Sequence, residues 1–411
     1  MKKFLLIALP LFVYGESLQS LLEFALNKNE LIVSKSISKN AKQSELKSSK
    51  SNYYPTIDVG GFYQRYDDAS PMSPGTTYGG YATIGMDIYS GSSKKYTLKQ
   101  KEDELRSSSF VYEATKKSVS LSIVQDFYNF KTLEASLFAR EEASKAVKAQ
   151  LDRMQSFYEA KLATSDDVDR LQSAYDRNVY DIESIKFQIL TLKKSLELKV
   201  GKEISSLDKS SFTKIQDQEL QELDSIKALR AQKSAVLNAS ETIDSYYYPQ
   251  IRVEDTYSLY GYADEPSVAG FRIDLPEKQN KIMATVNMRL FDFGAIAEAK
   301  ESVRLNADAI SQEIVYQDKE QKMNQELALS RIETAKLNIK SAASALKAAN
   351  SALVSITEKY NNGIVDNVVY LDALTSQTES KSRYEASLNN LELSYALYYY
   401  YNGKKLEEFL Q

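Results

Sequence analysis

The chain has 411 residues, with 52 Lys and Arg against 56 Asp and Glu, and it contains neither His nor Cys. A formal charge of −4 without any basic cluster argues against nucleic acid as a partner. The usual zinc and copper ligands are missing, so we expect no metal and no cofactor. The sequence shows no nucleophile–base pair and no phosphate-binding loop, and we therefore expect that the protein is not an enzyme.

The first 15 residues have the pattern of a secretory signal peptide. Lys2 and Lys3 precede an apolar run from Phe4 to Tyr14, and Gly15 is a small residue suited to cleavage. This run is too short for a transmembrane helix, which needs about 20 residues. An exported chain without Cys has no thiol for a lipid anchor, so we expect that protein alone holds it in place.

The remaining sequence consists of two copies of one plan. The offset is 194 residues at the first match, 249 − 55, and 202 at the later ones, 403 − 201. We therefore expect a first structural repeat over residues 16–207 and a second over residues 208–411. The matching residues are Tyr54-Pro55 with Tyr248-Pro249, Ala82, Ile84, Met86 and Ile88 with Ala284, Val286, Met288 and Leu290, Tyr158 with Tyr360, and Gly201 with Gly403.

Each repeat is expected to contain a helix, two strands, a very long helix, a break and a return helix. In the second repeat, apolar residues recur at spacings of three and four from Ala328 to Tyr360, which is the heptad pattern of a coiled coil. The uninterrupted helical pattern from Ala295 to Tyr360 predicts a rod of roughly 100 Å. The first repeat keeps the pattern more loosely, up to Tyr158. Two long antiparallel coiled-coil hairpins are therefore expected.

The predicted strands alternate between apolar and polar residues. Pro55 and Pro249 are expected to end the helices before them and, with Tyr54 and Tyr248, to mark the helix-to-strand junctions. Asp255 interrupts the apolar face of the strand that follows Pro249. The apolar face of that strand otherwise carries Ile251, Val253, Tyr257 and Leu259, and its polar face carries Arg252, Glu254, Thr256 and Ser258.

Taken alone, such strands fit either a soluble, half-buried sheet or a membrane β-barrel. The export signal and the Tyr residues at the junctions favour the membrane, where aromatic side chains gather at the interface. Four strands cannot close a barrel, and an open edge in lipid leaves backbone groups unpaired. The chain is therefore expected to oligomerise and to contact outer membrane lipid.

In this order, the motifs YEAKLATSDDV, from Tyr158, and KYNNGIVDNVVYLDA, from Lys359, resemble those of the TolC family of outer membrane efflux proteins. The resemblance covers essentially the whole mature chain. It implies a mainly α fold with a transmembrane β-barrel contribution: a homotrimer with a 12-strand barrel in the outer membrane of a Gram-negative bacterium and an α-helical tunnel in the periplasm. The implied function is the exit duct of a tripartite efflux or type I secretion system. The implied partners are a periplasmic adaptor, or membrane fusion protein, and an inner-membrane pump of RND, ABC or MFS type.

The resemblance also assigns roles to residues at the two helical turns. Lys161, Leu162, Gly363 and Ile364 would form the adaptor-docking tips, and Asp167, Tyr360 and Asp372 would form the gate or pore constriction. Val365 and Val369 occupy positions that are polar in the family, and Lys161 replaces its turn glycine. Other roles stay open: Asp167 is also an ordinary helix cap, Tyr360 also continues the heptad pattern, and Asp372 also suits a solvated face.

Two other classes of protein combine long helices with strands. A periplasmic adaptor has one hairpin and a Gly-rich lipoyl-like segment, whereas this chain predicts two hairpins and no such segment. A secreted coiled-coil structural protein lacks the duplicated strands and the signal peptide. The cargo of the channel cannot be predicted from this sequence.

Overall fold

A computed structural model describes residues 16–67, 74–214, 219–263, 267–268, 271–272 and 274–411. The predicted signal peptide lies outside these residues. Among the helices that are described, none is long and apolar enough to cross a bilayer. The described chain divides into two compact units, and each draws on both repeats. The hairpin unit is built from the described residues within the ranges 16–36, 111–224 and 317–411, and the strand unit from those within 37–110 and 225–316.

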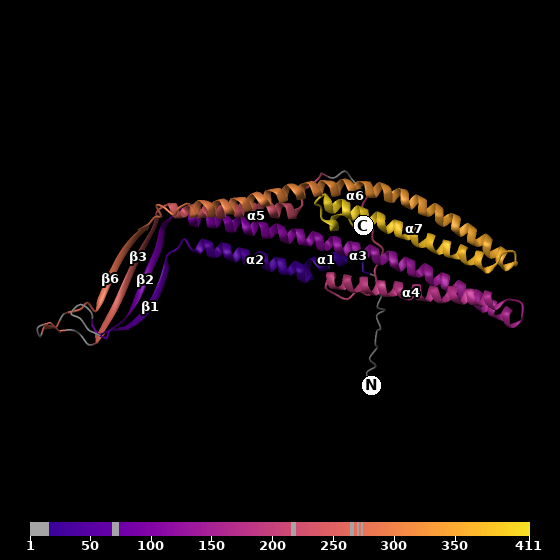
Figure 1. The fold of residues 1–411 in the computed structure, drawn as a ribbon, viewed down its shortest axis with the longest axis horizontal. Coiled ribbons are helices and arrows are strands. Elements are labelled where there is room, and N and C mark those ends of the chain that lie inside the picture. Colours follow the sequence, from indigo (N-terminus) through magenta and orange to yellow (C-terminus); the bar gives the residue numbers. More distant parts are fainter. Residues whose placement is uncertain (1–15, 68–73, 215–218, 264–266, 269–270, 273) are drawn as a thin grey trace, which may run out of the picture. The chain divides into compact units, whose positions relative to one another are not determined.

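The order of elements confirms the predicted architecture of long helices and four principal strands (Figure 1). The first half contains α1 (Leu18–Lys28), α2 (Glu30–Ser51), β1 (Thr56–Arg65), β2 (Thr76–Ser90), α3 (Ser93–Glu159) and α4 (Ser165–Val200). The second half contains α5 (Asp224–Ile243), the 3-10 turn η1 (Asp244–Tyr247), β3 (Gln250–Ala263), β4 (Ser267–Val268), β5 (Phe271–Arg272), β6 (Lys278–Asn287), α6 (Ala295–Asn361), α7 (Asn367–Tyr401) and η2 (Leu406–Phe409).

The long helices α3 and α6 have 67 residues each, which corresponds to about 100 Å of helix at 1.5 Å per residue. The heptad positions Ala328, Ile332 and Ala335 are each 2% exposed, as a coiled-coil seam requires. In the first half Val147 and Leu151 are buried, but Tyr158, the last residue of that predicted seam, is 48% exposed. The seam of α3 therefore ends before the helix does.

The core of the hairpin unit forms around α1. Leu18, Leu21, Leu22 and Ala25 lie on one face of this helix and are at most 1% exposed, because they pack against α3, α4 and α7. Asn29 separates α1 from α2. Its side-chain oxygen accepts hydrogen bonds from the backbone N–H groups of two α2 residues at 3.0 and 3.1 Å, so the predicted single opening helix is two helices.

In the strand unit the four main strands form one antiparallel sheet in the order β1-β2-β3-β6. The two predicted strand pairs are joined by the β2–β3 pairing, in which Ile84 lies opposite Asp255. The turn segment that follows β3 contains the short β4–β5 pair. Strand β6 ends at Asn287, so Met288 and Leu290, which were predicted to continue the strand, lie outside it.

Neither junction proline directly follows the α-helix before it in the sequence. Helix α2 ends at Ser51, four residues before Pro55. Helix α5 ends at Ile243, and the 3-10 turn η1 separates it from Pro249. The expectation that each proline directly ends its helix was therefore wrong, because the helices have already given way to turns when the prolines are reached.

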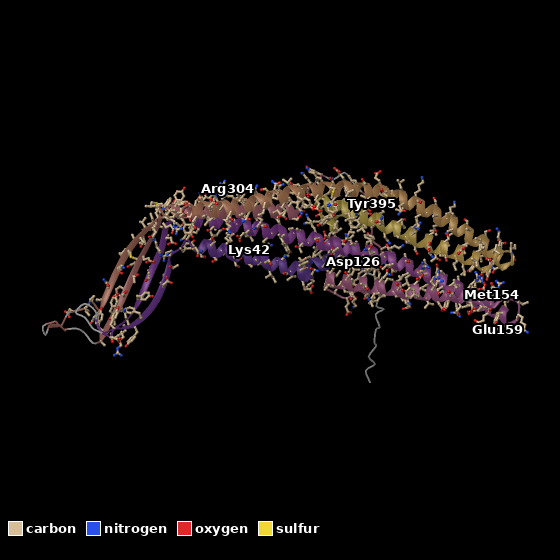
Figure 2. All side chains as sticks on the ribbon, viewed as in Figure 1. Lys42, Asp126, Met154, Glu159, Arg304 and Tyr395 are labelled. Atoms are coloured by element: carbon tan, nitrogen blue, oxygen red, sulfur yellow. The ribbon has the colours of Figure 1, made fainter. Side chains whose placement is uncertain are left out.

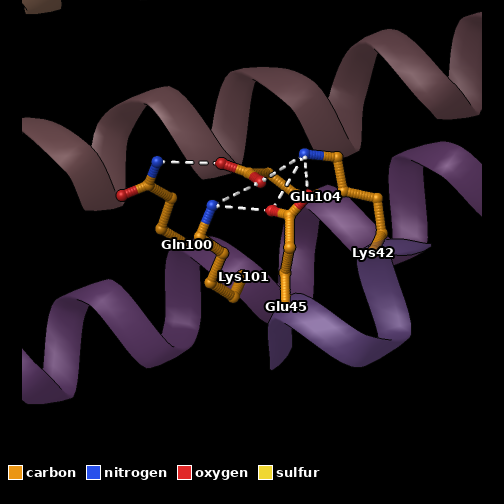
Figure 3. A network of polar contacts seen from close by, with 5 residues as sticks. All are labelled: Lys42, Glu45, Gln100, Lys101 and Glu104. Carbon is orange, nitrogen blue, oxygen red and sulfur yellow. Dashed lines mark hydrogen bonds and ion pairs between the residues drawn. The ribbon is translucent and has the colours of Figure 1, made fainter. Parts of the chain in front are cut away.

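Within the strand unit, the parts of α2 and α3 that belong to it are linked by a charged network (Figure 3). Glu104 is the common partner: its carboxylate lies 3.2 Å from Lys42 Nζ and 3.0 Å from Lys101 Nζ, and it accepts a hydrogen bond from Gln100 Nε2 at 2.8 Å. Glu45 contacts both lysines at 3.0 Å. Its hydrogen bond raises the pKa of Lys101. The network links the two helices, and partly exposed pairs of this kind contribute only about 0–1 kcal/mol each.

Candidate functional site: the hairpin tips and the faces of the sheet

The two helical hairpins reverse direction in turns of the same backbone conformation. In the first turn the N–H groups of Lys161 and Leu162 donate to Tyr158 O at 2.9 Å and Phe157 O at 2.8 Å. Figure 2 labels Glu159, the last residue of α3. In the second turn Gly363 donates to Tyr360 O at 3.0 Å, and Ile364 donates to a carbonyl of α6 at 2.8 Å. Both patterns are those of a Schellman motif.

The backbone conformation of Lys161 determines the shape of the first turn. Lys161 has φ +61°, close to the +71° of Gly363. A lysine therefore adopts the left-handed conformation that glycine adopts at no steric cost, and the first turn keeps its form without a glycine. Leu162 and Ile364, the next residue in each turn, are 76% and 69% exposed. The four predicted docking residues thus lie in the two turns, with two apolar side chains in solvent.

The return helices α4 and α7 begin with side-chain caps. Asp167 and Thr164 form a capping box, in which the Thr164 hydroxyl accepts from Asp167 N and the Asp167 carboxylate accepts from Thr164 N, both at 3.3 Å. The carboxylate also accepts from the Thr164 hydroxyl at 2.7 Å. Asp366 caps α7 by accepting from Val369 N at 3.1 Å. Asp167 has a second partner, because Asn367 Nδ2 lies 3.3 Å from both its backbone oxygen and its carboxylate. Asp167 is therefore a cap and also a link from α4 to α7.

Tyr360 is a packed residue at the end of α6. Its ring stacks on that of Tyr370, with centroids 5.0 Å apart, and both pack beside Val147 of α3 and Leu374 of α7. Burial raises the pKa of the Tyr360 phenol, the guanidinium of Arg153 lowers it, and the carboxylate of Asp167 raises it. Tyr360 is therefore a packed residue, as its heptad position indicates.

A second link joins the two hairpins. Arg153 of α3 donates from Nη1 to Asn361 Oδ1 at 2.9 Å, and its guanidinium lies 5.2 Å from the ring centroid of Phe157. We call this contact, together with that of Asn367 with Asp167, the inter-hairpin latch. Sequence reasoning did not find Arg153, because a single arginine on an exposed helix face carries no distinguishing signal. Two latch residues, Asn361 and Asn367, flank the turn that contains Val365, where the family resemblance implies a polar residue.

Asp372 has an exposed side chain on α7. It lines a groove of about 770 Å³ formed by α3, α4 and α7. Three arginines and four acidic residues share this groove, and one pair of them, Arg140 with Asp181, is 3.3 Å apart. The charge beside Asp372 is therefore mixed. The charged lining residues are Arg140, Asp169, Arg170, Arg177, Asp181, Asp372 and Glu379.

One face of the four-stranded sheet is apolar and exposed. The register places Ile57, Ile84, Asp255 and Ile282 in one row across the strands. Ile57 is 71% and Ile282 74% exposed, and Val59 of the next row is 82% exposed. So much exposed apolar surface on one sheet requires a cover that the single chain does not provide. Asp255 lies within this face, as predicted.

The opposite face is polar and internally paired. Arg252 contacts Asp87 at 2.8 Å and Glu254 at 2.7 Å, and Lys94 contacts Asp87 at 3.0 Å. Gly85 makes room for this cluster, since a Cβ there would lie 2.7 Å from the Arg252 guanidinium. At the helix end of the sheet the predicted junction residues Tyr54 and Tyr248 are 73% and 53% exposed, next to Pro55 and Pro249.

Comparisons with known proteins agree with this geometry. The family model described as "Outer membrane efflux protein" matches residues 21–199. No curated protein is a significant match to the chain. Among solved structures, the CmeC outer membrane channel of Campylobacter jejuni aligns with 95% of this chain and 86% of its own, at a TM-score of 0.83 and 13% identity.

Two further structures show the same fold. A membrane protein from Pseudomonas aeruginosa aligns with 94% of this chain and 93% of its own, at a TM-score of 0.82 and 14% identity. The open state of the MtrE outer membrane channel of Neisseria gonorrhoeae aligns with 95% of this chain and 89% of its own, at a TM-score of 0.76 and 12% identity. Sequence identity is low in each case, so the likeness is one of fold.

Proposed function

We propose that the chain is a member of the TolC family of outer membrane efflux proteins and that it is the outer membrane exit duct of a tripartite efflux or type I secretion system. Proteins of this family are channels of the outer membrane that extend into the periplasm. They form trimers and work with adaptor and pump partners. The role proposed for this chain is therefore conduction, without an enzymatic step.

The observation that carries the proposal is the two-faced sheet. Its apolar face suits lipid, and its polar face suits a water-filled lumen. Among the described residues, no further strand pairs with the outer edges of β1 and β6. Unpaired backbone groups cost several kcal/mol each in lipid, and closing the edges removes that cost. Three copies provide twelve strands for one barrel, with the exposed tyrosines at Tyr54 and Tyr248 at its periplasmic rim.

We assign gating to the hairpin tips. The latch links α3 to α6 and α4 to α7, so it resists the separation of the two hairpins. Asp167 contributes to it directly, and Tyr360 contributes through its stacking on Tyr370. Asp372, in the groove nearby, would line the narrow mouth in the trimer. Opening then requires an input that replaces these contacts.

That input would come from the partner complex. Leu162 and Ile364 are apolar and exposed beside the two left-handed turn residues, Lys161 and Gly363, and we assign all four to adaptor contact. The adaptor connects the channel to an inner-membrane pump of RND, ABC or MFS type. Nothing in this assignment requires a cofactor or a metal.

Reconstitution of the purified protein in planar lipid bilayers tests the function. A trimeric exit duct produces discrete single-channel currents that are small while the tips are closed. Deletion of the gene should raise the sensitivity of the cell to the compounds that the pump exports, and the wild-type gene should restore it. Trimers that insert into lipid without conducting would refute the proposed function.

A further inference from the structure

The segment between β6 and α6 exposes four large apolar side chains among six consecutive residues. Met288 is 49%, Leu290 80%, Phe291 71% and Phe293 92% exposed. The two phenylalanine rings contact one another edge to face, with centroids 4.6 Å apart. We call residues 288–293 the anchor segment.

The backbone of the anchor segment is held in place. Asp292 accepts hydrogen bonds from Gly294 N at 3.1 Å, from Ile296 N at 2.9 Å and from the Tyr247 hydroxyl at 2.9 Å. These bonds cap α6 and tie the segment to η1. The exposed rings are therefore presented by a fixed loop.

The conformation of Phe293 is unfavourable for its residue type. Its φ is +56°, a region that bulky residues rarely adopt. The matching position of the first repeat, 293 − 202, is Gly91, which has φ +60°. The second repeat thus places a phenylalanine where the first places a glycine, and it gains no buried contact in return. An unfavourable backbone with an exposed aromatic points to a role outside the single chain.

The surroundings of the segment indicate its partner. It directly follows β6, whose apolar residues Ile282 and Val286 are also exposed. The exposed Arg289 lies within the segment, with its guanidinium 5.6 Å from the ring centroid of Tyr246. Aromatic rings together with an arginine suit the boundary between hydrocarbon and phosphate headgroups.

We propose that the anchor segment inserts into the inner, phospholipid leaflet of the outer membrane, with Leu290, Phe291 and Phe293 at the acyl boundary and Arg289 on lipid phosphate. The inference rests on the proposed function, because it takes the sheet to be in the membrane with its helix end toward the periplasm. One segment per chain gives three anchors per trimer. They fix the depth of a barrel that has no Cys for lipid attachment.

The chain contains no tryptophan, so a single introduced tryptophan reports its own surroundings. Phe293→Trp is placed in trimers reconstituted in phosphatidylcholine–phosphatidylglycerol vesicles with brominated acyl chains. We expect a strong loss of tryptophan emission relative to unbrominated vesicles. Tyr316→Trp, at a 64% exposed position of α6, is the matched control and should keep its emission in both. Phe291→Trp repeats the test if the first variant does not assemble.

Each other outcome overturns the inference. Blue-shifted emission without quenching means that the segment packs against a second copy of the chain, and Phe291→Ser with Phe293→Ser would then also lower the temperature at which trimers dissociate. Red-shifted emission without quenching means that the segment faces water. Single-channel currents from the same preparation separate the two proposals: conducting trimers without quenching refute the anchor alone, and trimers without conduction refute the proposed function.

Discussion

Arg153 offers the sharpest test of the gate, because its contact with Asn361 joins the two hairpins through one exposed side chain on each. Arg153→Met removes the donor and keeps the unbranched stem on α3. A hydrogen bond to a charged group is worth about 1.5–3 kcal/mol when desolvated, and exposed pairs are worth about 0.2–1 kcal/mol. The exposure of this pair places it near the lower range, at about 0.5–1 kcal/mol.

Three copies act on one gate, so the closed state loses about 1.5–3 kcal/mol in the trimer. At 1.4 kcal/mol for each factor of ten, the ratio of open to closed channels rises about 10- to 150-fold. Single-channel recordings measure this ratio as open probability. Asn361→Ala should give a similar increase, and the double variant should add little to either, since both remove the same contact.

The matched control is Lys148→Met on the same helix. Lys148 is 48% exposed and pairs with Asp152 at 2.9 Å within α3, so its loss changes the charge equally without touching the other hairpin. Its open probability should stay near that of the wild type. Equal open probabilities for Arg153→Met and Lys148→Met would show that the contact does not hold the gate.

Three other variants test separate parts of the account. Gly363→Val places a β-branched residue at φ +71°, at a cost of about 1–2 kcal/mol, so export should stop while trimers still reach the outer membrane; normal export would remove the tip from adaptor docking. Asp372→Asn should weaken cation selectivity and relieve block by multivalent cations applied from the periplasmic side, and unchanged currents would place Asp372 on a solvated outer face. Burial raises the pKa of Glu392, so its ionised form destabilises the fold. Glu392→Gln should therefore raise the unfolding temperature increasingly as pH rises from the ordinary glutamate pKa through the raised one, and a gain independent of pH would contradict this cause.

The regular parts of the fold could be predicted from the sequence because they repeat. Heptad spacing predicted α6 to within one residue of Asn361, and alternation predicted the strands that follow the Tyr-Pro junctions. The boundaries that failed depend on single local contacts. Asn29 caps α2 and thereby divides the opening helix in two. Asp292 caps α6, and Met288 lies in the connection before this cap, outside the strand.

The sequence predicted the candidate site residues that lie in the helical turns. It did not predict the side-chain contacts between different helices. The docking residues follow from the turns, and the structure adds that Lys161 adopts the backbone of a glycine. A polar contact between hairpins depends on how each helix is rotated about its own axis. A heptad pattern predicts which apolar residues face the seam, but it does not predict which polar residues face the other hairpin. The contacts of Arg153 and Asn367 between the hairpins were therefore identified only from the structure.

The mass of the protein in mild detergent tests the central claim most directly. Light scattering with correction for bound detergent should give three times the mass of one mature chain, and unheated samples should run as a trimer that boiling dissociates. A monodisperse monomer with its sheet intact would contradict the account, because a four-stranded sheet with two open edges cannot form a channel in lipid.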